Sequence, residues 1–239
     1  MGSWRFESTK NDHFFSNVLS ELKEKNIKKV QNGVTVLRKK FESKNIPGGW
    51  PWDDIGNYYG AGAAAINWHE NQYDIILKSG NEIGKPVKFV RYIPGSLYLP
   101  VNNELTTAGK GTGDNTIIFL GLNGEKAILS GTIPMDEKEF KISGAVPSPV
   151  NFFEDQFNYF LKKNNYRDSI SLSPQTALRP YNTIIDSQLV FKPFYEYYSP
   201  PLDSINYWFL QKSINLYGEA FVKTIAYEKN RFWCHRYRY

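Results

Sequence analysis

A glycine-rich segment, Gly109-Lys-Gly-Thr-Gly-Asp, contains the residue types of a phosphate-binding loop. Such a loop binds phosphate when it follows a buried strand and opens a helix, because the N–H groups at the helix terminus then meet the anion. Here Asn115-Thr-Ile-Ile-Phe-Leu follows the loop, and this run predicts a strand instead. We therefore interpret residues 109–114 as a surface turn without a phosphate site.

The three histidines and the single cysteine could bind a metal or form a nucleophilic pair. His13, His69 and His235 show no spacing typical of a zinc site, and Cys234 and His235 are adjacent on a predicted strand, where they face opposite ways. A Cys–His nucleophile would require His13 or His69 to approach Cys234 in space. We favour a buried or interfacial thiol, and we expect no metal, no cofactor and no catalytic residue.

Carboxylates occur in adjacent pairs at Asp53-Asp54, Asp136-Glu137 and Glu154-Asp155. A pair of this kind can perform acid–base chemistry when burial separates the two pKa values. Adjacent acids in turns and at helix starts are usually solvated, so we expect these pairs to lie at the surface.

The C-terminal segment, Arg231-Phe-Trp-Cys-His-Arg-Tyr-Arg-Tyr, alternates cations with aromatic rings. Cation–π contacts and tyrosine–carboxylate hydrogen bonds would let it pair with a second copy of the chain. It could also form an ordinary edge hairpin, or stack nucleic-acid bases while binding their phosphates. We favour the contact between copies.

Helical patterns that would position these residues occur in three places. Residues 12–25 place Phe15 and Leu19 on one narrow apolar face, residues 149–163 start at a proline and carry an aromatic face, and a third helix runs from about 204 to Gly218. Most of the remaining chain predicts strands: residues 34–41, 73–77, 87–93, 96–99, 116–120, 125–132, 139–146, 169–172, 183–192, 221–228 and 231–239. Asn123-Gly124 predicts a tight hairpin between two of them.

This order of elements lacks a regular β-α-β alternation. It predicts a β-rich α+β fold, an antiparallel β-sandwich or barrel with about three peripheral helices, one of them an N-terminal amphipathic helix. We expect residues 1–239 to form one domain, with residues 1–30 as a helical arm that packs on a neighbouring molecule.

The composition contains many aromatic residues, with 16 Tyr, 16 Phe and 6 Trp, and the net charge is only +5. Tyrosine suits a surface that another surface will cover. The cations are spread along the chain, so we do not expect a nucleic-acid partner. No run of apolar residues is long enough to predict a membrane span, and a lone cysteine fits an intracellular protein.

The order of several segments resembles the occlusion-body proteins of insect viruses, the polyhedrin and granulin group and the cypovirus polyhedrins. The resemblance covers about residues 97–201: a strand Glu139-Phe-Lys-Ile-Ser, a short loop, the aromatic helix from Phe152, then Ile184-Ile-Asp-Ser-Gln-Leu-Val-Phe-Lys and Ser199-Pro-Pro. It implies a structural matrix protein without catalytic residues, which assembles into intracellular crystalline occlusion bodies in the cytoplasm or nucleus of an infected cell.

The partners implied by this resemblance are copies of the same chain and virus particles. The lattice would dissolve at alkaline pH, because tyrosine and lysine lose their protons near pH 10. The expected self-assembly contacts are Phe15, Leu19, Tyr195, Tyr197, Tyr198, Arg231, Arg236, Tyr237, Arg238 and Tyr239.

Two other functions remain open from the sequence. One is an enzyme, a delivered bacterial toxin domain that acts on nucleotides or envelope lipid. The other is a module that binds nucleic acid or glycan through its aromatic surface. A deep pocket with converging polar groups would favour the enzyme, and a continuous basic stripe would favour the nucleic-acid binder.

Overall fold

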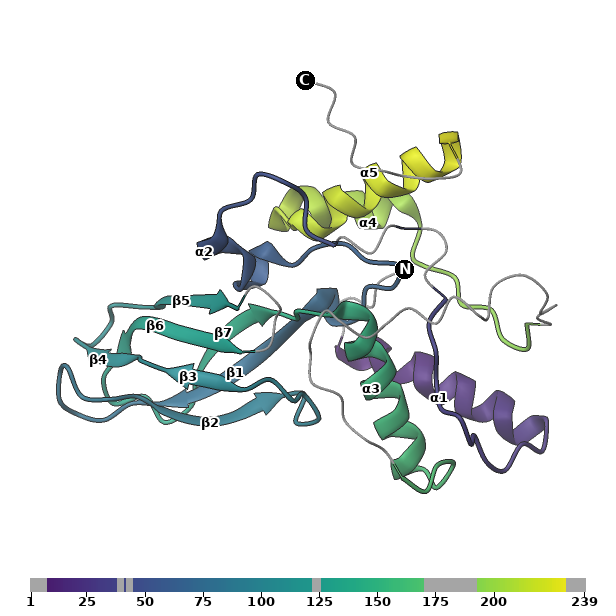
Figure 1. Cartoon of the computed structure of the whole chain (residues 1–239), viewed down its shortest axis with the longest axis horizontal. Helices are drawn as coiled ribbons and strands as arrows, with labels where there is room; N and C mark the ends of the chain where they lie inside the picture. Colours follow the sequence, from purple (N-terminus) through teal and green to yellow (C-terminus); the bar gives the residue numbers. More distant parts are fainter. Residues whose placement is uncertain (1–7, 38–40, 42–44, 122–125, 170–192, 231–239) are drawn as a thin grey trace.

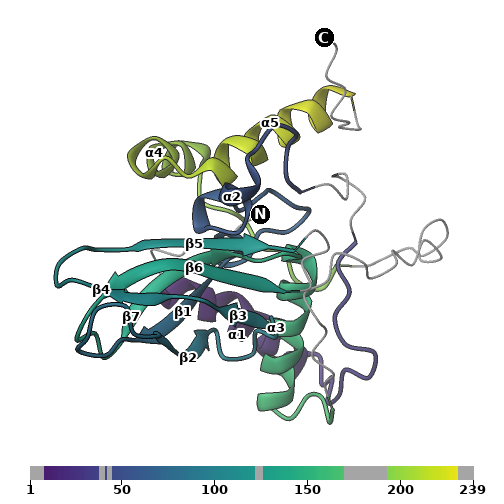
Figure 2. The same cartoon turned by 60° about the vertical axis from the view of Figure 1, so that its left-hand side comes forward.

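Two β-sheets and five α-helices build the part of the chain that the computed structural model describes, namely residues 8–37, 41, 45–121, 126–169 and 193–230. The sheets form one side of the molecule (Figure 1). Two helices, α1 (Ser8–Glu24) and α3 (Pro149–Lys163), lie side by side beyond them. A second helical layer, α4 (Leu202–Lys212) and α5 (Asn215–Asn230), lies over the sheets (Figure 2).

The first sheet has the order β2-β1-β7 and is antiparallel throughout. Its strands are β1 (Gln72–Lys78), β2 (Lys88–Ile93) and β7 (Phe140–Ala145). The central strand β1 buries Tyr73, Ile75 and Leu77, which project from one face because side chains alternate along a strand.

The second sheet is built around β6 (Ala127–Pro134). Its neighbours are β5 (Asn115–Leu120), which is antiparallel, and the short strands β3 (Val101–Asn103) and β4 (Thr106–Ala108), which are parallel. Leu120 pairs with Ala127, so β5 and β6 form a hairpin around residues 122–125. The predicted hairpin is confirmed, although Asn123 and Gly124 themselves lie outside the described residues.

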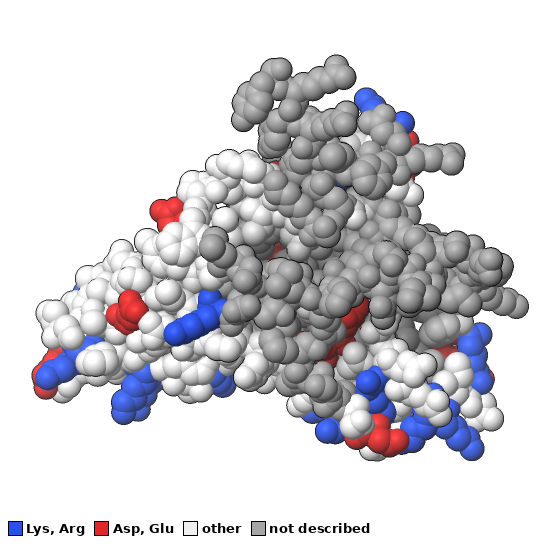
Figure 3. Space-filling model, in the orientation of Figure 1, with Lys and Arg blue, Asp and Glu red and all other residues white. Residues whose placement is uncertain are grey.

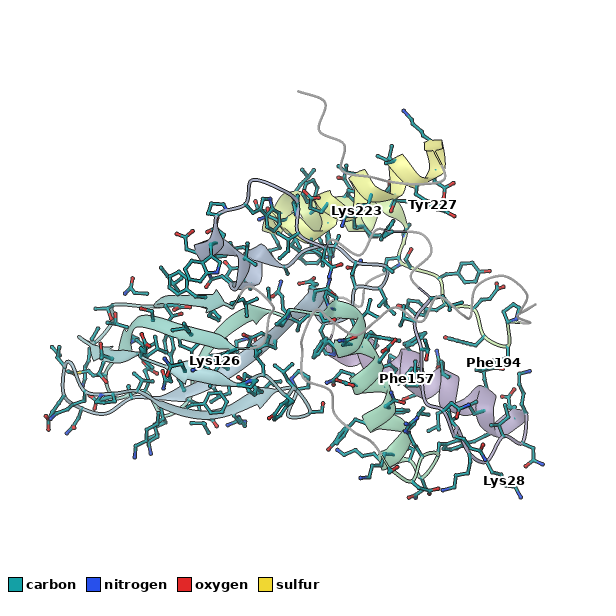
Figure 4. The ribbon with its side chains drawn as sticks, in the orientation of Figure 1. Lys28, Lys126, Phe157, Phe194, Lys223 and Tyr227 are labelled. Atoms are coloured by element: carbon teal, nitrogen blue, oxygen red, sulfur yellow. The ribbon has the colours of Figure 1, made fainter. Side chains whose placement is uncertain are left out.

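The helix α1 packs on α3 through aromatic rings. Phe15 stacks on Trp68, with ring centroids 4.4 Å apart, and on Phe157 of α3, with centroids 4.6 Å apart. Figure 4 shows Phe157 between the two helices. Pro149 begins α3, and Phe152, Phe157 and Leu161 recur at helical spacing and are buried, as the sequence predicted.

A long connection between α1 and β1 carries the short helix α2 (Trp52–Ile55) and two 3₁₀ turns, η1 (Tyr58–Gly60) and η2 (His69–Asn71). The second helical layer packs on this connection. A small apolar cluster joins them, formed by Ala63, Leu216 and Tyr217 and bordered by Ile205, Trp208, Phe209, Ile214 and Ala220.

The mixed α+β class is confirmed, but several predicted elements are wrong. The described strands do not close into a barrel. The predicted third helix is two helices that meet at Ser213, and residues 221–228, predicted as a strand, belong to α5. Residues 34–37 and 96–99 are not strands. The predicted strands at 183–192 and 231–239 lie outside the described residues.

No helix in the described ranges combines the length and the apolar character needed to cross a membrane.

Candidate functional site

The junction of α4 and α5 holds a serine in an unusual backbone conformation. Ser213 has φ +49° and ψ +47°, the left-handed region, and it is exposed between the last residue of α4 and the first turn of α5. This conformation is costly for a residue other than glycine, and such outliers concentrate at functional sites. The strained Ser213 therefore makes the α4–α5 junction a candidate functional site.

Asn215, two residues further on, begins α5 and fastens the junction to the rest of the fold. Its side-chain Nδ2 donates to the main-chain oxygen of Tyr59 in η1 over 2.9 Å. Burial raises the pKa of the Tyr59 phenol, and the charge and hydrogen bonding of Asp54 raise it further. Asn215, Tyr59 and Asp54 thus come together from two distant parts of the chain, and Ser213 lies two residues before Asn215.

A cavity of about 330 Å³ opens beside these residues. It is lined by Asp54, Glu219, Asn215 and Tyr59 together with Trp50, Pro51, Gly60, Phe209 and Gly218. The lining thus combines two carboxylates and an amide with aromatic rings. Such a mixture of apolar walls and a few polar groups is typical of small-molecule sites.

Behind the cavity, α5 is held by two buried hydrogen bonds. The hydroxyl of Tyr217 donates to Glu70 Oε1 over 2.7 Å, and Nζ of Lys223 donates to the carbonyl of Ala63 over 2.7 Å. Glu70 is 2% exposed and Lys223 is 0% exposed. Burial raises the pKa of Tyr217, and the neighbouring Glu70 carboxylate raises it further.

The segment that accepts these bonds is itself tightly hydrogen-bonded. Asn71 Nδ2 donates to the carbonyl of Gly62 over 2.8 Å and to Asn67 Oδ1 over 2.7 Å. Asn67 Oδ1 also accepts from the backbone N–H of Ala64. Residues 62–71 therefore form a stiff support for α5.

A second, larger cavity of about 520 Å³ is also bordered by α5. Its lining is mostly apolar and includes Leu216, Phe221 and Tyr227, with one charged group, Glu228. Its amide comes from Asn67, and Asn215 does not line it.

The residues singled out from the sequence do not form a site together. The loop at 109–114 precedes β5, a strand, so its interpretation as a turn is confirmed. Among the described residues no cluster of His, Cys, Asp or Glu could hold a metal ion. Cys234 and His235 lie outside those residues. Of the carboxylate pairs, Glu154-Asp155 is buried in α3, contrary to the prediction.

The expected self-assembly contacts fall into three groups. Phe15 and Leu19 are buried in the core of this chain. Tyr195 accepts from Asn17 Nδ2 over 3.1 Å, Tyr197 packs edge-on against Phe14, and Tyr198 is exposed. The others, Arg231, Arg236, Tyr237, Arg238 and Tyr239, lie outside the described residues. The burial of Phe15 and Leu19 is explained by the fold of one molecule.

Cations gather at the ends of α1 and α3, with Lys23, Lys162 and Lys163 in the last turns of these helices. Figure 3 shows a group of cations at one corner and scattered cations among the other described residues, which form no continuous basic stripe in this view. The arrangement gives no support to the nucleic-acid alternative.

Comparison with known proteins identifies a related family. A model of the D-Ala-D-Ala carboxypeptidase 3 (S13) family matches residues 7–235. The crystal structure of penicillin binding protein 4 from Haemophilus influenzae superposes with a TM-score of 0.66 at 18% identity, covering 92% of this chain and 46% of that one. A structure of that protein in complex with a β-lactam gives a TM-score of 0.57, 18% identity and coverages of 92% and 44%.

These findings overturn the resemblance to the insect-virus occlusion-body proteins. The family is one of peptidases, so the predictions of a non-enzymatic matrix protein, a lattice with copies of itself and virus particles, alkaline dissolution and a location in an infected cell are wrong. The toxin and binding-module alternatives do not match the family either. The chain spans less than half the length of the solved structures, and at 18% identity these show the fold alone.

Ser213 and Asn215 are not among the site residues predicted from the sequence. No glycine or proline interrupts the pattern between 204 and 217, so nothing marked a junction there. The available signal was the tetrapeptide Lys212-Ser-Ile-Asn within an otherwise apolar and aromatic run.

Proposed function

The chain belongs to the D-Ala-D-Ala carboxypeptidase 3 (S13) family, and from this premise we propose that it supplies part of the active site of a serine D-Ala-D-Ala carboxypeptidase. The part concerned is the α4–α5 junction. Ser213 and Asn215 would act there on a peptide substrate bound in the adjoining cavity. The observation that carries the proposal is the strained, exposed Ser213 next to an amide that lines a cavity.

Penicillin-binding proteins combine three short sequence elements, S-x-x-K with the nucleophilic serine, S-D-N, and K-T-G. Ser213-Ile-Asn215 corresponds to the second element, with isoleucine at the middle position. A serine hydroxyl can both accept and donate a proton, so Ser213 could relay protons during acyl transfer. The Asn215 amide carries two N–H donors, of which Tyr59 uses one, and the other could bind a substrate carbonyl.

Close matches to the other two elements occur in the chain, but the structure keeps them apart. Ser20-Glu-Leu-Lys23 lies on α1, where Ser20 Oγ donates to the carbonyl of Ser16. Lys78-Ser79-Gly80 follows the end of β1, and Ser79 is buried, donating to the carbonyl of Pro134. Figure 1 shows α1, the sheets and the α4–α5 layer as separate parts of the fold. We therefore do not assign Ser20 or Ser79 to the site.

The described residues therefore provide no assigned nucleophile. The second helical layer has an uncovered surface, because α4 buries no side chain fully and large apolar residues are exposed. Leu202 is 65% exposed and Leu210 is 67% exposed, and the others are Tyr207, Val222 and Ile225. Such a patch marks a surface that packs against further protein.

The charge of the cavity indicates one feature of the substrate. Asp54 and Glu219 both line it, so it would favour a ligand with a positively charged group near the reacting peptide. The aromatic walls from Trp50 and Phe209 would contact the apolar part of the same ligand.

The finer architecture is also proposed. Ile75 and Ile142 of the first sheet share one buried cluster with Ile118, Leu129 and Ile133 of the second. This supports the predicted packing of two sheets face to face. That residues 1–239 form one domain stays a prediction.

Labelling with a fluorescent β-lactam tests the proposed function. The protein is expected to form a covalent adduct. Ser213→Ala and Asn215→Ala should each slow labelling about 100-fold, the usual effect of removing an acid–base group or a transition-state donor. Ser20→Ala is the matched control and should label at the wild-type rate. Absence of labelling, or labelling that depends on Ser20 and not on Ser213, contradicts the proposal.

A further inference from the structure

Three residues of α5 make four side-chain hydrogen bonds to the segment 45–71. Asn215 at the start of the helix bonds to Tyr59, Tyr217 bonds to Glu70, and Lys223 bonds to Ala63 and Asn45. Figure 4 shows Lys223 on the face of α5 that is turned toward the rest of the fold. The nine residues from Asn215 to Lys223 cover about 12 Å of helix, so these bonds hold both ends of the first two turns.

Stability alone does not explain why a lysine, Lys223, holds this helix. Its side chain is 0% exposed, and its ammonium donates to the Ala63 carbonyl over 2.7 Å and to the Asn45 carbonyl over 3.4 Å. Lysine is almost never fully buried, because removing the charge from water costs several kcal/mol. An apolar side chain of similar volume often serves stability as well or better. The hydrogen bond does, however, fix the distance between the Lys223 ammonium and the Ala63 carbonyl.

The backbone that accepts from Lys223 is held in place on its other side. A Cβ on Gly62 would lie 2.4 Å from the Asn45 carbonyl oxygen, and one on Gly60 would lie 2.1 Å from the Asp54 carbonyl oxygen. Within this connection, Gly62 therefore lies against the backbone of Asn45, and Gly60 lies against the backbone of Asp54. Ala63 is 0% exposed within this contact, so its carbonyl is a rigid reference point.

We propose that Lys223 is a positioning residue for Ser213 and Asn215, with Tyr217 as its support. Its bond to Ala63 sets the position of α5 along its axis. That position determines how Asn215 meets the Tyr59 carbonyl and where Ser213, two residues earlier, is placed. An error of about 1 Å in such alignment can cost 100-fold in rate. This inference rests on the proposed carboxypeptidase function.

Lys223→Met tests the role, because it removes the ammonium and keeps the length and the apolar stem of the side chain. The reaction with a fluorescent β-lactam is resolved into the dissociation constant of the initial complex and the acylation rate. We expect the acylation rate to fall at least about tenfold, with an unchanged dissociation constant and an unchanged melting temperature. Lys223→Arg, which retains buried donors, should recover a substantial part of the rate.

Lys229→Met is the matched control, since Lys229 is exposed in the last turn of α5. It should acylate as the wild type does. If Lys223→Met does not fold, Tyr217→Phe decides, because it removes only the hydroxyl that bonds to Glu70. An acylation rate equal to that of the wild type in the folded variant overturns the inference. A fall shared with Lys229→Met overturns it as well.

The two proposals fail in distinguishable ways. If Ser213→Ala and Asn215→Ala acylate normally, the proposed function itself is wrong. If these two variants are slow while Lys223→Met is not, the proposed function stands and the positioning role of Lys223 is rejected.

Discussion

The side-chain amide of Asn215 donates a hydrogen bond to the main-chain carbonyl of Tyr59, 156 positions earlier in the chain. This bond ties the second helical layer to the connection that precedes β1. It also fixes Asn215, two residues after Ser213, in the lining of the cavity.

Asn215→Ala separates the structural from the chemical effect of this bond. We expect the free energy of unfolding to fall by about 1 kcal/mol, the usual net value of one hydrogen bond. Labelling by a β-lactam should fall much further. Asn17→Ala is the control, because Asn17 makes a comparable exposed bond to Tyr195 far from the junction. Asn17→Ala should lower the free energy of unfolding, measured by urea unfolding, by a similar amount. Its rate of labelling should not change.

Gly56 lies where α2 meets the second sheet. A Cβ at this position would stand 1.8 Å from the backbone oxygen of Ile118 in β5. Because backbone cannot yield as a flexible side chain does, Gly56→Ala should destabilise the protein by about 3 kcal/mol. Gly80→Ala, with nothing within 4 Å of the added Cβ, should change the melting temperature little. Equal melting temperatures for the two variants would contradict the close approach of Gly56 to Ile118.

A substitution of Phe15 tests whether this residue packs in the core of one molecule or in an interface between copies. Its ring stacks on Trp68 and Phe157, and it is 7% exposed. Phe15→Ala should therefore lower the free energy of unfolding by about 3–5 kcal/mol, the range for a buried phenylalanine. Tyr198→Ala, at a site that is 78% exposed, should have little effect. Light scattering accompanies the unfolding curves, and a change of oligomeric state without loss of stability in Phe15→Ala would restore the interface interpretation.

Buried phenols make the stability depend on alkaline pH. Burial raises the pKa of Tyr92 to about 12, and it raises the pKa of Tyr73 as well. The unfolded chain ionises these groups near pH 10 while the folded chain keeps their protons, so the unfolded state binds fewer protons above that pH. The free energy of unfolding should therefore be fully present below about pH 10 and fall as pH rises toward 12.

Urea midpoints measured across this range test the dependence. Tyr73→Phe removes one buried phenol and should make the fall shallower, whereas Tyr198→Phe, at an exposed site, should leave it unchanged. A slope that Tyr73→Phe does not alter would show that other groups cause the loss.

The resemblance to the occlusion-body proteins failed because it depended on the order of a strand, a turn, a strand and a helix. Many folds share that order, so it carries little information about function. The tyrosine content misled for a related reason. Tyr73 and Tyr217 are buried within the molecule, and Tyr92 is half-buried, so part of the aromatic surplus serves the core of one chain.

The local sequence by itself determined the elements whose signals lie within a few residues of one another. Pro149 and the aromatic spacing after it specify α3, and the alternation on either side of Asn123-Gly124 specifies the β5–β6 hairpin. These features depend on backbone geometry and on side-chain periodicity, which can be read from neighbouring positions.

Only the tertiary structure decided the α4–α5 junction and the site beside it. Val222, Thr224 and Ile225 favour a strand locally, yet they lie in α5, where Lys223 and Tyr217 bond to a distant segment and Leu216 packs on Ala63. The left-handed Ser213 has no local signal, because bonds to Tyr59, Ala63 and Glu70 hold α5, the helix that follows it. Contacts between residues about 150 positions apart cannot be read from a sequence window, and they place the groups that we propose for catalysis.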